Sequence, residues 1–421
     1  MIPDSIGRYL RRRSMDGPWK LEGATDRLFA GAVVIPALAE GDHLFATLES
    51  LAGATPPPQP WLIIVVVNHR RQTDPHRQQV NRDDLDRLRH SGGSFHGLPL
   101  AWVDAATDGR ELPDKDGVGL ARKIGFDLAL PCLDYRGAPP LLASLDADTL
   151  VRPDYFLALL RHFPQTRAGA AVIPFCHQPA DTAEGQAAID RYELYLHHYA
   201  LGLELAGSPY AFWTVGSALS FRAEAYARMG GMNRRQAGED FYFLQQMAKT
   251  AGVARLQGTE VYPSPRLSDR TPFGTGPTVG RLLAGEPEAV RFYHPECFRL
   301  LARWLDLAGS ASVHPATEVL AQARRLSNDL GDFLDGNDFG SVWERLQKNH
   351  PQQEGFRRAF HGWFDGLKTL QLIHWMSDRR FGRLAPPAAL PPLLAWAGLP
   401  PADHSAAQLA ALRRHMAGTS T

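Results

Sequence analysis

Leu-Leu-Ala-Ser-Leu-Asp-Ala-Asp, residues 141–148, decides the fold, because a short apolar run ends there in two aspartates one residue apart. The run predicts a buried strand over 141–145, and in open α/β sheets ligands bind beyond the carboxyl ends of the strands. Asp146 and Asp148 would then face a ligand, and carboxylate oxygens suit Mg²⁺ or Mn²⁺ together with substrate phosphates. The alternative is an ordinary turn in which Asp148 only caps the backbone.

On both sides of this stretch, from about residue 30 to 265, short apolar runs alternate with helical patterns. This alternation predicts an α/β domain with a mostly parallel mixed sheet flanked by helices. Further strands are expected at residues 32–35, 62–67, 101–103 and 170–174, and helices at 42–51, 119–130, 153–163 and 186–205. The polar segment from His69 to Gly97 is expected to be a solvated, partly mobile excursion at the ligand-binding end.

After about Leu300 the pattern changes, and helical periodicity replaces the strand-like runs. We therefore expect an N-terminal extension over 1–29, the α/β domain over 30–298 and an α-helical C-terminal region over 299–421. The Pro-rich stretch 385–393 is expected to break the chain before a last short helix.

The composition argues against several classes of protein. The 421 residues include 45 Lys and Arg and 45 Asp and Glu, so the chain lacks the basic excess of a nucleic-acid binder. The longest apolar runs fall short of the roughly 20 residues that a membrane span needs. Cys132, Cys176 and Cys297 are few and far apart, which favours a reducing compartment. We expect a cytoplasmic protein with no secretory signal, no transmembrane segment and no nucleic-acid partner.

A second acidic pair, in Gly238-Glu239-Asp240, precedes apolar residues at helical spacing. The N–H groups and dipole of a helix N-terminus favour an ionised carboxylate, and near a ligand such a carboxylate can act as a general base towards a hydroxyl group. The plainer reading is a helix cap, because acidic residues are common at that position.

Two glycines, Gly117 and Gly119, precede a helix whose first turns carry Arg122 and Lys123. Glycines allow a ligand to approach the backbone closely, and helix N–H groups and cations suit phosphate oxygens. The spacing fits neither a P-loop nor G-x-G-x-x-G, which weakens a dinucleotide-binding reading.

Taken in order, these motifs resemble those of the family 2 glycosyltransferases with the GT-A fold, of the soluble bacterial type and here with a helical C-terminal extension. The resemblance covers about residues 30–262. It rests on VVIPALAE (33–40), LIIVVVN (62–68), GLARK (119–123), LDADTLVRPDY (145–155), TVGSALSFRAEAY (214–226) and GGMNRRQAGEDFYF (230–243).

The resemblance implies that a sugar nucleotide is the donor. The residues that it places against the nucleobase are Pro36, Ala37, Glu40 and Asn68. Arg122, and with it Lys123, would lie near the diphosphate. Two departures leave the nucleotide open: Leu38-Ala39 replace the usual Tyr-Asn, and Asn68-His69 replace the usual Asp-Asp. The amide of Asn68 still offers donors and an acceptor to a base edge.

The resemblance also implies that Asp146 and Asp148 bind the metal, with Asp146 touching the ribose or diphosphate. Asp240 would be the base, with Glu239 as its neighbour or as an acceptor contact. His294 is a further candidate for the metal shell, as a histidine is in some GT-A enzymes, although a lone histidine is more often structural.

Weaker candidates lie between and after these motifs. Trp213 and Gly216 are candidates for a wall against the acceptor sugar, and a strand crossing the core is the alternative. Arg266 and Arg270 lie in a turn-rich segment, residues 264–276, which is expected to close over a diphosphate or an anionic acceptor.

We therefore expect a metal-dependent, inverting glycosyltransferase of the hexosyl type that uses Mn²⁺ or Mg²⁺ and a carbohydrate or other hydroxyl acceptor. Two alternatives stay open at this stage: a nucleotidyltransferase that binds a sugar nucleotide, and a catalytically degenerate binding protein of the same fold. A retaining outcome is also open, because retaining enzymes of this fold use the same aspartate motif and a metal.

Overall fold

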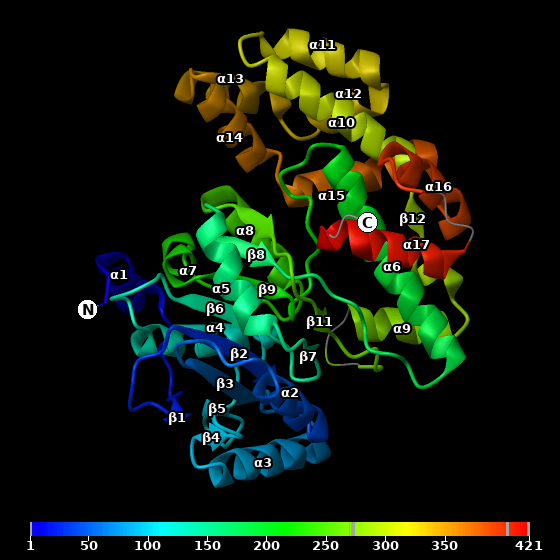
Figure 1. Cartoon of the computed structure of the whole chain (residues 1–421). Coiled ribbons are helices and arrows are strands. Elements are labelled where there is room, and N and C mark those ends of the chain that lie inside the picture. Colours follow the sequence, from blue (N-terminus) through cyan, green and yellow to red (C-terminus); the bar gives the residue numbers. More distant parts are fainter. Residues whose placement is uncertain (1, 269, 271–273, 401–403, 419–421) are drawn as a thin grey trace.

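The computed structural model describes residues 2–268, 270, 274–400 and 404–418 (Figure 1). Its centre is one large sheet with the strand order β1-β5-β3-β2-β6-β9-β8-β10, and β4 pairs with β5 at one end. The strands are β1 (Glu22–Gly23), β2 (Gly31–Ala37), β3 (Trp61–Asn68), β4 (Ser94–Phe95), β5 (Leu98–Ala105), β6 (Leu141–Ser144), β8 (Ala170–Val172), β9 (Leu219–Arg222) and β10 (Val253–Arg255).

Four neighbouring strands are parallel: β5, β3, β2 and β6 run in one direction, and the short edge strands β1 and β4 are antiparallel to β5. β9 lies antiparallel between β6 and β8, and β10 is parallel to β8. All residues of β2 and β3 are buried, as continuous apolar runs in a parallel sheet with both faces covered should be. The α/β fold with a mostly parallel mixed sheet, expected from the sequence, is therefore confirmed.

Helices cover this sheet and bring their first turns to the strand ends. They are α1 (Asp4–Arg13), α2 (Asp42–Ala52), α3 (Pro75–His90), α4 (Val118–Ala129), α5 (Tyr155–Gln165), α6 (Ala183–Leu205), α7 (Ala223–Met229) and α8 (Glu239–Thr250). α4 packs very closely on β2, because a Cβ atom added at Gly125 would lie 2.4 Å from Val34 Cγ1.

The expectation for residues 69–97 is wrong. This segment forms α3 and β4, and Leu85 and Leu88 of α3 are buried. The helix begins after Asp74, whose side chain accepts a hydrogen bond from Arg77 N, with proline at the first position. The helix gives little apolar periodicity in the sequence, because only a narrow stripe of it faces β3 and β5 and most of its residues are polar or charged.

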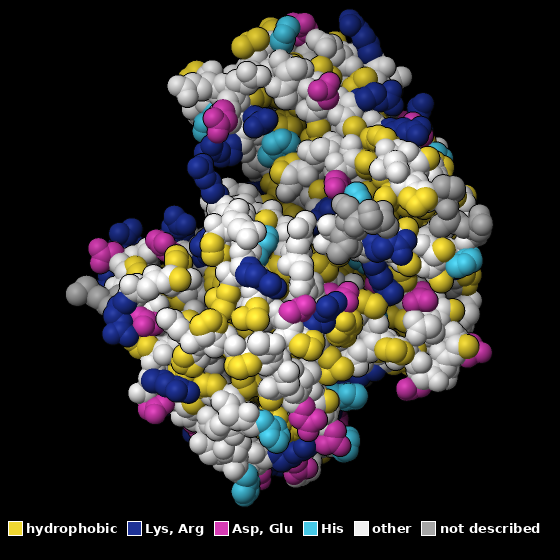
Figure 2. Space-filling view, viewed as in Figure 1, with side chains coloured by type: hydrophobic (Ala, Val, Ile, Leu, Met, Phe, Trp, Pro, Cys, Tyr) yellow, Lys and Arg dark blue, Asp and Glu magenta, His cyan; other side chains and the backbone are white. Residues whose placement is uncertain are grey.

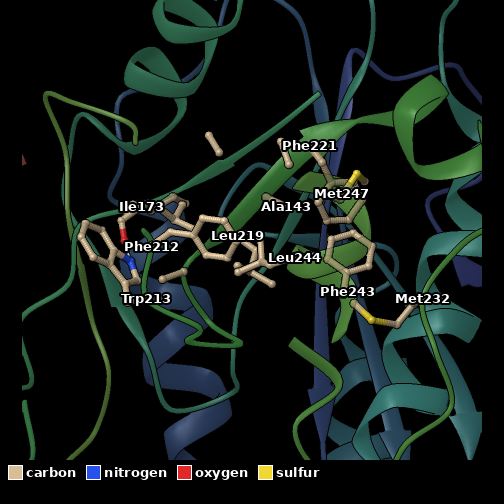
Figure 3. Close-up of a cluster of buried hydrophobic side chains, with 14 of the residues drawn as sticks. Ala143, Ile173, Phe212, Trp213, Leu219, Phe221, Met232, Phe243, Leu244 and Met247 are labelled. Carbon is tan, nitrogen blue, oxygen red and sulfur yellow. Dashed lines mark hydrogen bonds between the residues drawn. The ribbon is translucent and has the colours of Figure 1, made fainter. Parts of the chain in front are cut away.

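A hydrophobic core joins β9 to α8 (Figure 3). Leu219 and Phe221 of β9 are fully buried, and the ring of Phe221 lies 4.8 Å from that of Phe243 in α8. Met247, one turn further along α8, is also fully buried. This packing fixes α8, and hence Glu239 and Asp240 in its first turn, against the strand beside β6.

The C-terminal region is helical, as expected. It contains α10 (Pro295–Ser310), α11 (Ala316–Leu326), α12 (Asn328–Asp335), α13 (Phe339–Asn349), α14 (Gln353–Trp363), α15 (Gly366–Met376), α16 (Pro386–Trp396) and α17 (Ser405–Ala417). Aromatic side chains form its core, with the rings of Phe339, Phe360 and Phe364 all within 6.0 Å of Trp304. Among the described residues, no helix is both long and apolar enough to cross a membrane.

The expected break at 385–393 is wrong, because this Pro-rich stretch is mostly α16. Pro386 and Pro387 stand in its first turn, where the missing N–H groups have no helical partner anyway. Pro391 and Pro392 lie inside the helix, and the buried side chains of Leu390, Leu393 and Leu394 hold it in place.

Short elements complete the fold around this sheet. β7 (Leu150–Val151) pairs with β11 (Val261–Tyr262), β12 (Phe292–Tyr293) pairs with β13 (Arg383–Leu384), and α9 (Thr275–Leu283) packs on α6. Figure 2 shows the surface hollowed where the C-terminal helices meet the α/β part. A groove of about 370 Å³ lies there, lined by the last turn of α8 and by α14. It is at the far end of α8 from Asp240.

Candidate active site

The site lies at the carboxyl end of β6. Leu145 N donates a 3.1 Å hydrogen bond to Val34 O, which keeps the chain beside β2 just beyond the strand. Asp146 and Asp148 follow, separated by the buried Ala147, whose carbonyl accepts a 3.0 Å hydrogen bond from the hydroxyl group of Thr47. The two aspartates therefore stand at the edge of the sheet where the sequence predicts a ligand.

Arg122 is the centre of this site. Its guanidinium, 3% exposed, donates a 2.9 Å hydrogen bond to Ser144 Oγ and forms ion pairs with Asp146 and Glu239. We call these four residues the Arg122 cluster. A buried guanidinium shared by two carboxylates satisfies its donors and locks β6, α4 and α8 together.

Glycines make room for the cluster. A Cβ atom added at Gly216 would lie 2.4 Å from Arg122 Nη2, so the backbone of Gly216 forms the surface behind the guanidinium. A Cβ atom at Gly119 would lie 2.7 Å from the carbonyl oxygens of Asn233 and Arg235. Both positions require glycine for close approach, one behind Arg122 and one between the start of α4 and the segment before α8.

Asp240 lies beside the cluster in the first turn of α8, where its Oδ1 accepts a 2.7 Å hydrogen bond from Phe241 N. Burial, and then the negative charge of Glu239, raise the pKa of Asp240 to about 7, although Arg122 acts in the opposite direction. This pKa suits a general base near neutral pH.

Electrostatic coupling links the two acidic motifs. Burial raises the pKa of Asp146, and the charges of Asp148 and Glu239 act in the same direction, against Arg122. Asp146 in turn contributes to the raised pKa of Asp240. Asp148 and Asp240 thus both interact with the carboxylate of Asp146, so the two acidic motifs belong to one site.

A second set of arginines covers Asp148. Residues 264–268 and 270, here called the arginine loop, place Arg266 Nε 2.6 Å from Asp148 Oδ2, and the same guanidinium pairs with Glu40. Arg270 Nη1 lies 2.6 Å from Glu40 Oε1, and its Nη2 donates to Ala39 O at 3.0 Å. Burial raises the pKa of Glu40 to about 6, with Arg270 and Arg266 opposing it. The other residues of the expected 264–276 loop include 269 and 271–273, which lie outside the described residues.

The residues predicted for the nucleobase meet at the ends of β2 and β3. Pro36 and Ala37 are buried in β2, and the amide of Asn68 donates 3.0 Å hydrogen bonds to the carbonyl oxygens of Ala37 and Val66. Asn81 of α3 completes the arrangement by donating to Asn68 O and accepting from Ala39 N. The sequence gives no signal for Asn81, because the residue stands in a polar segment whose pattern predicts a solvated excursion.

The structure does not bring Lys123 to this site. Lys123 Nζ is buried 3.0 Å from Asp127 Oδ2 and donates to the hydroxyl group of Tyr9 in α1. Adjacent residues of a helix point in different directions, so Arg122 and Lys123 serve different clusters.

Trp213 lies in the core and not on a wall of the site. Its indole is 2% exposed and donates a 3.0 Å hydrogen bond to Ile173 O (Figure 3). His294 caps α10, where its Nδ1 accepts a hydrogen bond from Glu296 N at 3.1 Å and its ring stacks on Phe381. The acceptor-wall prediction for Trp213 is thereby corrected in favour of core packing, and His294 is engaged away from Asp146 and Asp148.

Two further residues reach the site without a signal in the sequence. Gln178 Nε2 donates to the carbonyl oxygens of Asp148, at 2.9 Å, and Tyr262, at 2.7 Å. Tyr192 of α6 hydrogen-bonds Thr275 and lies within electrostatic reach of Asp240. Tyr192 belongs to an apolar helical stripe, so the pattern alone indicates core packing.

The donor set fits a hard cation only in part. Asp146 and Asp148 offer carboxylate oxygens, but no group of three or more His, Cys, Asp or Glu side chains that could hold an ion is found within the described ranges. One or two carboxylates completed by substrate phosphates are the usual arrangement for Mg²⁺. These residues therefore fit a cation that arrives with a diphosphate.

Part of the chain is similar to known glycosyltransferases: residues 141–275 match the family model described as "Glycosyl transferase family group 2". No curated protein matches the sequence. Among solved structures, TarS 1–349 of S. aureus in complex with UDP-GlcNAc is 13% identical with a TM-score of 0.38, covering 78% of this chain and 89% of that chain. The mannosyltransferase PcManGT from Pyrobaculum calidifontis in complex with GDP-Man and Mn²⁺ is 13% identical with a TM-score of 0.36, covering 99% and 93%.

The matched segment begins at β6 and ends at the start of α9, so it contains both acidic motifs and the arginine loop. The strand order and this match agree with the GT-A class expected from the sequence. Residues 141–275 are thus similar to glycosyl transferase family group 2, and the resemblance predicted from the sequence is confirmed over that segment.

Proposed function

We propose that the protein is a metal-dependent, inverting glycosyltransferase that moves a hexose from a nucleotide-diphosphate sugar to a hydroxyl group of a carbohydrate or other acceptor. One observation carries the proposal: Arg122 pairs with Asp146, in the aspartate motif at the end of β6, and with Glu239, which is next to Asp240 in the first turn of α8. A base and a diphosphate site in one place are what transfer between a leaving diphosphate and an attacking hydroxyl requires.

In this mechanism Asp240 accepts the proton of the acceptor hydroxyl as its oxygen attacks the anomeric carbon. The bond from that carbon to the diphosphate oxygen breaks on the opposite face, so the configuration inverts. Arg122 holds Asp146 and Glu239 in place beside the base. A base with a pKa near the working pH combines a useful ionised fraction with proton affinity.

The donor would lie across the ends of β2, β3 and β6. Its nucleobase would lie at the ends of β2 and β3, beside Pro36, Ala37 and Asn68, whose amide hydrogens already bond backbone carbonyl groups, with Glu40 at the side. Asp146 and Asp148 would hold the divalent cation, which supplies charge neutralisation at the leaving diphosphate. The arginine loop would move from Asp148 and Glu40 to the phosphate oxygens, because guanidinium groups pair with phosphates as well as with carboxylates.

A cytoplasmic location belongs to the same proposal. Cys132, Cys176 and Cys297 are free thiols. Free cysteines fit a reducing compartment such as the cytoplasm.

A ligand screen tests the function. The melting temperature of the protein is measured with UDP-, GDP-, dTDP- and CDP-sugars, each with and without MnCl₂. A donor that binds the folded state raises the melting temperature by mass action, and we expect one class to do so only with Mn²⁺. Turnover of that donor should release a nucleoside diphosphate. Release of pyrophosphate, or no shift with any donor, would refute the proposal.

A further inference from the structure

The last helix, α17, reaches the α/β part of the molecule at a buried carboxylate. α17 lies across α6 (Figure 1), and its Leu409, Ala411 and Leu412 are buried in that contact. Arg413 Nε donates a 2.5 Å hydrogen bond to Oε1 of Glu193 in α6, whose side chain is 0% exposed. A wholly buried glutamate is costly unless it is paired, so this contact constrains both helices.

The other oxygen of Glu193 holds the chain that follows β8. Glu193 Oε2 accepts two hydrogen bonds from His177: one from the backbone N–H at 2.9 Å and one from ring Nδ1 at 2.7 Å. Burial alone would raise the pKa of Glu193, but the bonds from His177, His197 and Arg413 lower it well below its ordinary value. Glu193 therefore stays ionised and keeps both sets of bonds.

The segment held in this way, residues 175–178 and here called the support segment, touches two parts of the candidate active site. Gln178 Nε2 donates to the carbonyl oxygen of Asp148, and Gln178 N donates to Pro263 O at 2.9 Å. Cys176 N donates to Val261 O at 3.0 Å. The support segment thus holds the backbone of Asp148 on one side and, on the other, the strand that leads directly into the arginine loop.

We propose that Arg413 and Glu193 are positioning residues of the active site: α17 fixes Glu193, and Glu193 fixes the support segment on which Asp148 and the arginine loop depend. The helical C-terminal region is then a working part of the donor site and not an independent appendage. The inference rests on the proposed function for its substrate, but the order of the support segment is measurable without any substrate.

The test compares Arg413→Met with Arg345→Met, which removes an arginine from an exposed position on α13. Hydrogen–deuterium exchange is followed in peptides that cover residues 175–178 and 261–268. We expect faster exchange there in Arg413→Met only. Equal exchange in both variants and the wild type would overturn the proposal, whatever the activity of the protein.

Binding gives the second measurement. The affinity for UDP and for GDP, each with MnCl₂, is measured by titration calorimetry. Wild-type binding of either nucleotide shows that the donor site exists. We then expect Arg413→Met to weaken binding roughly tenfold or more, the range found when groups that support metal ligands are removed. Unchanged affinity in Arg413→Met would contradict the positioning role, whereas failure of the wild type to bind either nucleotide would count against the proposed function instead.

Stability is separated from positioning by two more variants. Arg413→Met leaves a buried charge short of a partner and should unfold at lower denaturant, whereas Glu193→Gln with Arg413→Met removes that charge. We expect the double variant to regain stability but not nucleotide affinity. Arg413→Lys, which keeps the charge, should restore part of the affinity. Recovery of full affinity in the double variant would show that only stability is at stake.

Discussion

The acidic residues of this site pair with arginines in two places: Arg122 in the Arg122 cluster, here called the fixed group, and Arg266 and Arg270 in the arginine loop. The two places are built differently. Arg122 comes from a helix, is 3% exposed, and its carboxylate partners follow β6 and begin α8. Arg266 and Arg270 come from a loop, and each side chain is 22% exposed. The first group is fixed by packed elements on all sides. The second can exchange its partners, because loops move at lower cost than packed helices.

This difference separates the charges that hold the site in place from those that can change partners when a ligand binds. Arg122 holds Asp146 and Glu239 in place and acts on the pKa of Asp146 and of Asp240 before any substrate arrives. The arginine loop neutralises Glu40 and Asp148 in the free protein and is available for a phosphate group once one is present.

The strongest test of the comparison removes the proposed base, Asp240, which lies beside the Arg122 cluster. Asp240→Asn should lower kcat by roughly 10² to 10⁴, the usual range for loss of a general base, and leave nucleotide affinity nearly unchanged. Initial rates and calorimetry measure the two effects. Turnover at the wild-type level would remove Asp240 from the role of base.

Arg122→Met tests whether the fixed group is structural as well as functional. It leaves Glu239 buried without its cation, so the free energy of unfolding should fall by about 3–5 kcal/mol. Arg266→Met should cost less, because the Arg266 side chain is 22% exposed and its partner Glu40 keeps the ion pair with Arg270. Urea denaturation of both variants checks the contrast. Equal losses would show that the two groups do not differ in rigidity.

Arg266→Met should instead affect donor binding. Loss of a charge-assisted hydrogen bond costs about 1.5–3 kcal/mol, so the KM for the donor should rise roughly tenfold or more with a smaller change in kcat. Arg281→Met serves as a control, since Arg281 lies on α9 and pairs with Glu286. A donor KM that is the same in both variants would contradict exchange of partners by the loop.

The smallest effect concerns pH. The proposed base, Asp240, would act in its ionised form, so kcat/KM should rise with pH through a midpoint near its pKa of about 7. Glu239→Gln removes a negative charge that raises this pKa, so the midpoint should move to lower pH. Arg266→Met should leave the midpoint in place. If the midpoint moves in Arg266→Met, or does not move in Glu239→Gln, the arginine loop and the Arg122 cluster do not act on Asp240 in the different ways described here.

Much of this arrangement follows from local sequence. Apolar runs that end in Asp146, Asn68 and Pro36-Ala37 predict parallel strands, and parallel strands bring their carboxyl ends to one edge of a sheet. The second acidic motif begins a helix, as its spacing predicts. These features depend on a few neighbouring residues and on the period of the pattern.

The partners of each charge do not follow in the same way. Arg122 and Glu239 are 117 positions apart, and Glu40 and Arg270 are 230 apart, so their pairing depends on tertiary packing. The same holds for α16, in which buried leucines outweigh the cost of two internal prolines. The position of Lys123, by contrast, could be predicted from the sequence: adjacent residues of a helix point in different directions, so Lys123 could not lie beside Arg122 in the same site.

The ion pair between Arg266 and Asp148 has a kinetic consequence. A bare Mn²⁺ or Mg²⁺ ion that approaches Asp148 is repelled by the positive charge of Arg266 and brings no anion with which that guanidinium could pair instead. A cation already chelated by a nucleotide would bring phosphate oxygens, and Arg266 would then pair with a phosphate in place of Asp148. We expect initial-rate measurements to show the metal–nucleotide complex as the entering species, with excess free metal giving no further acceleration.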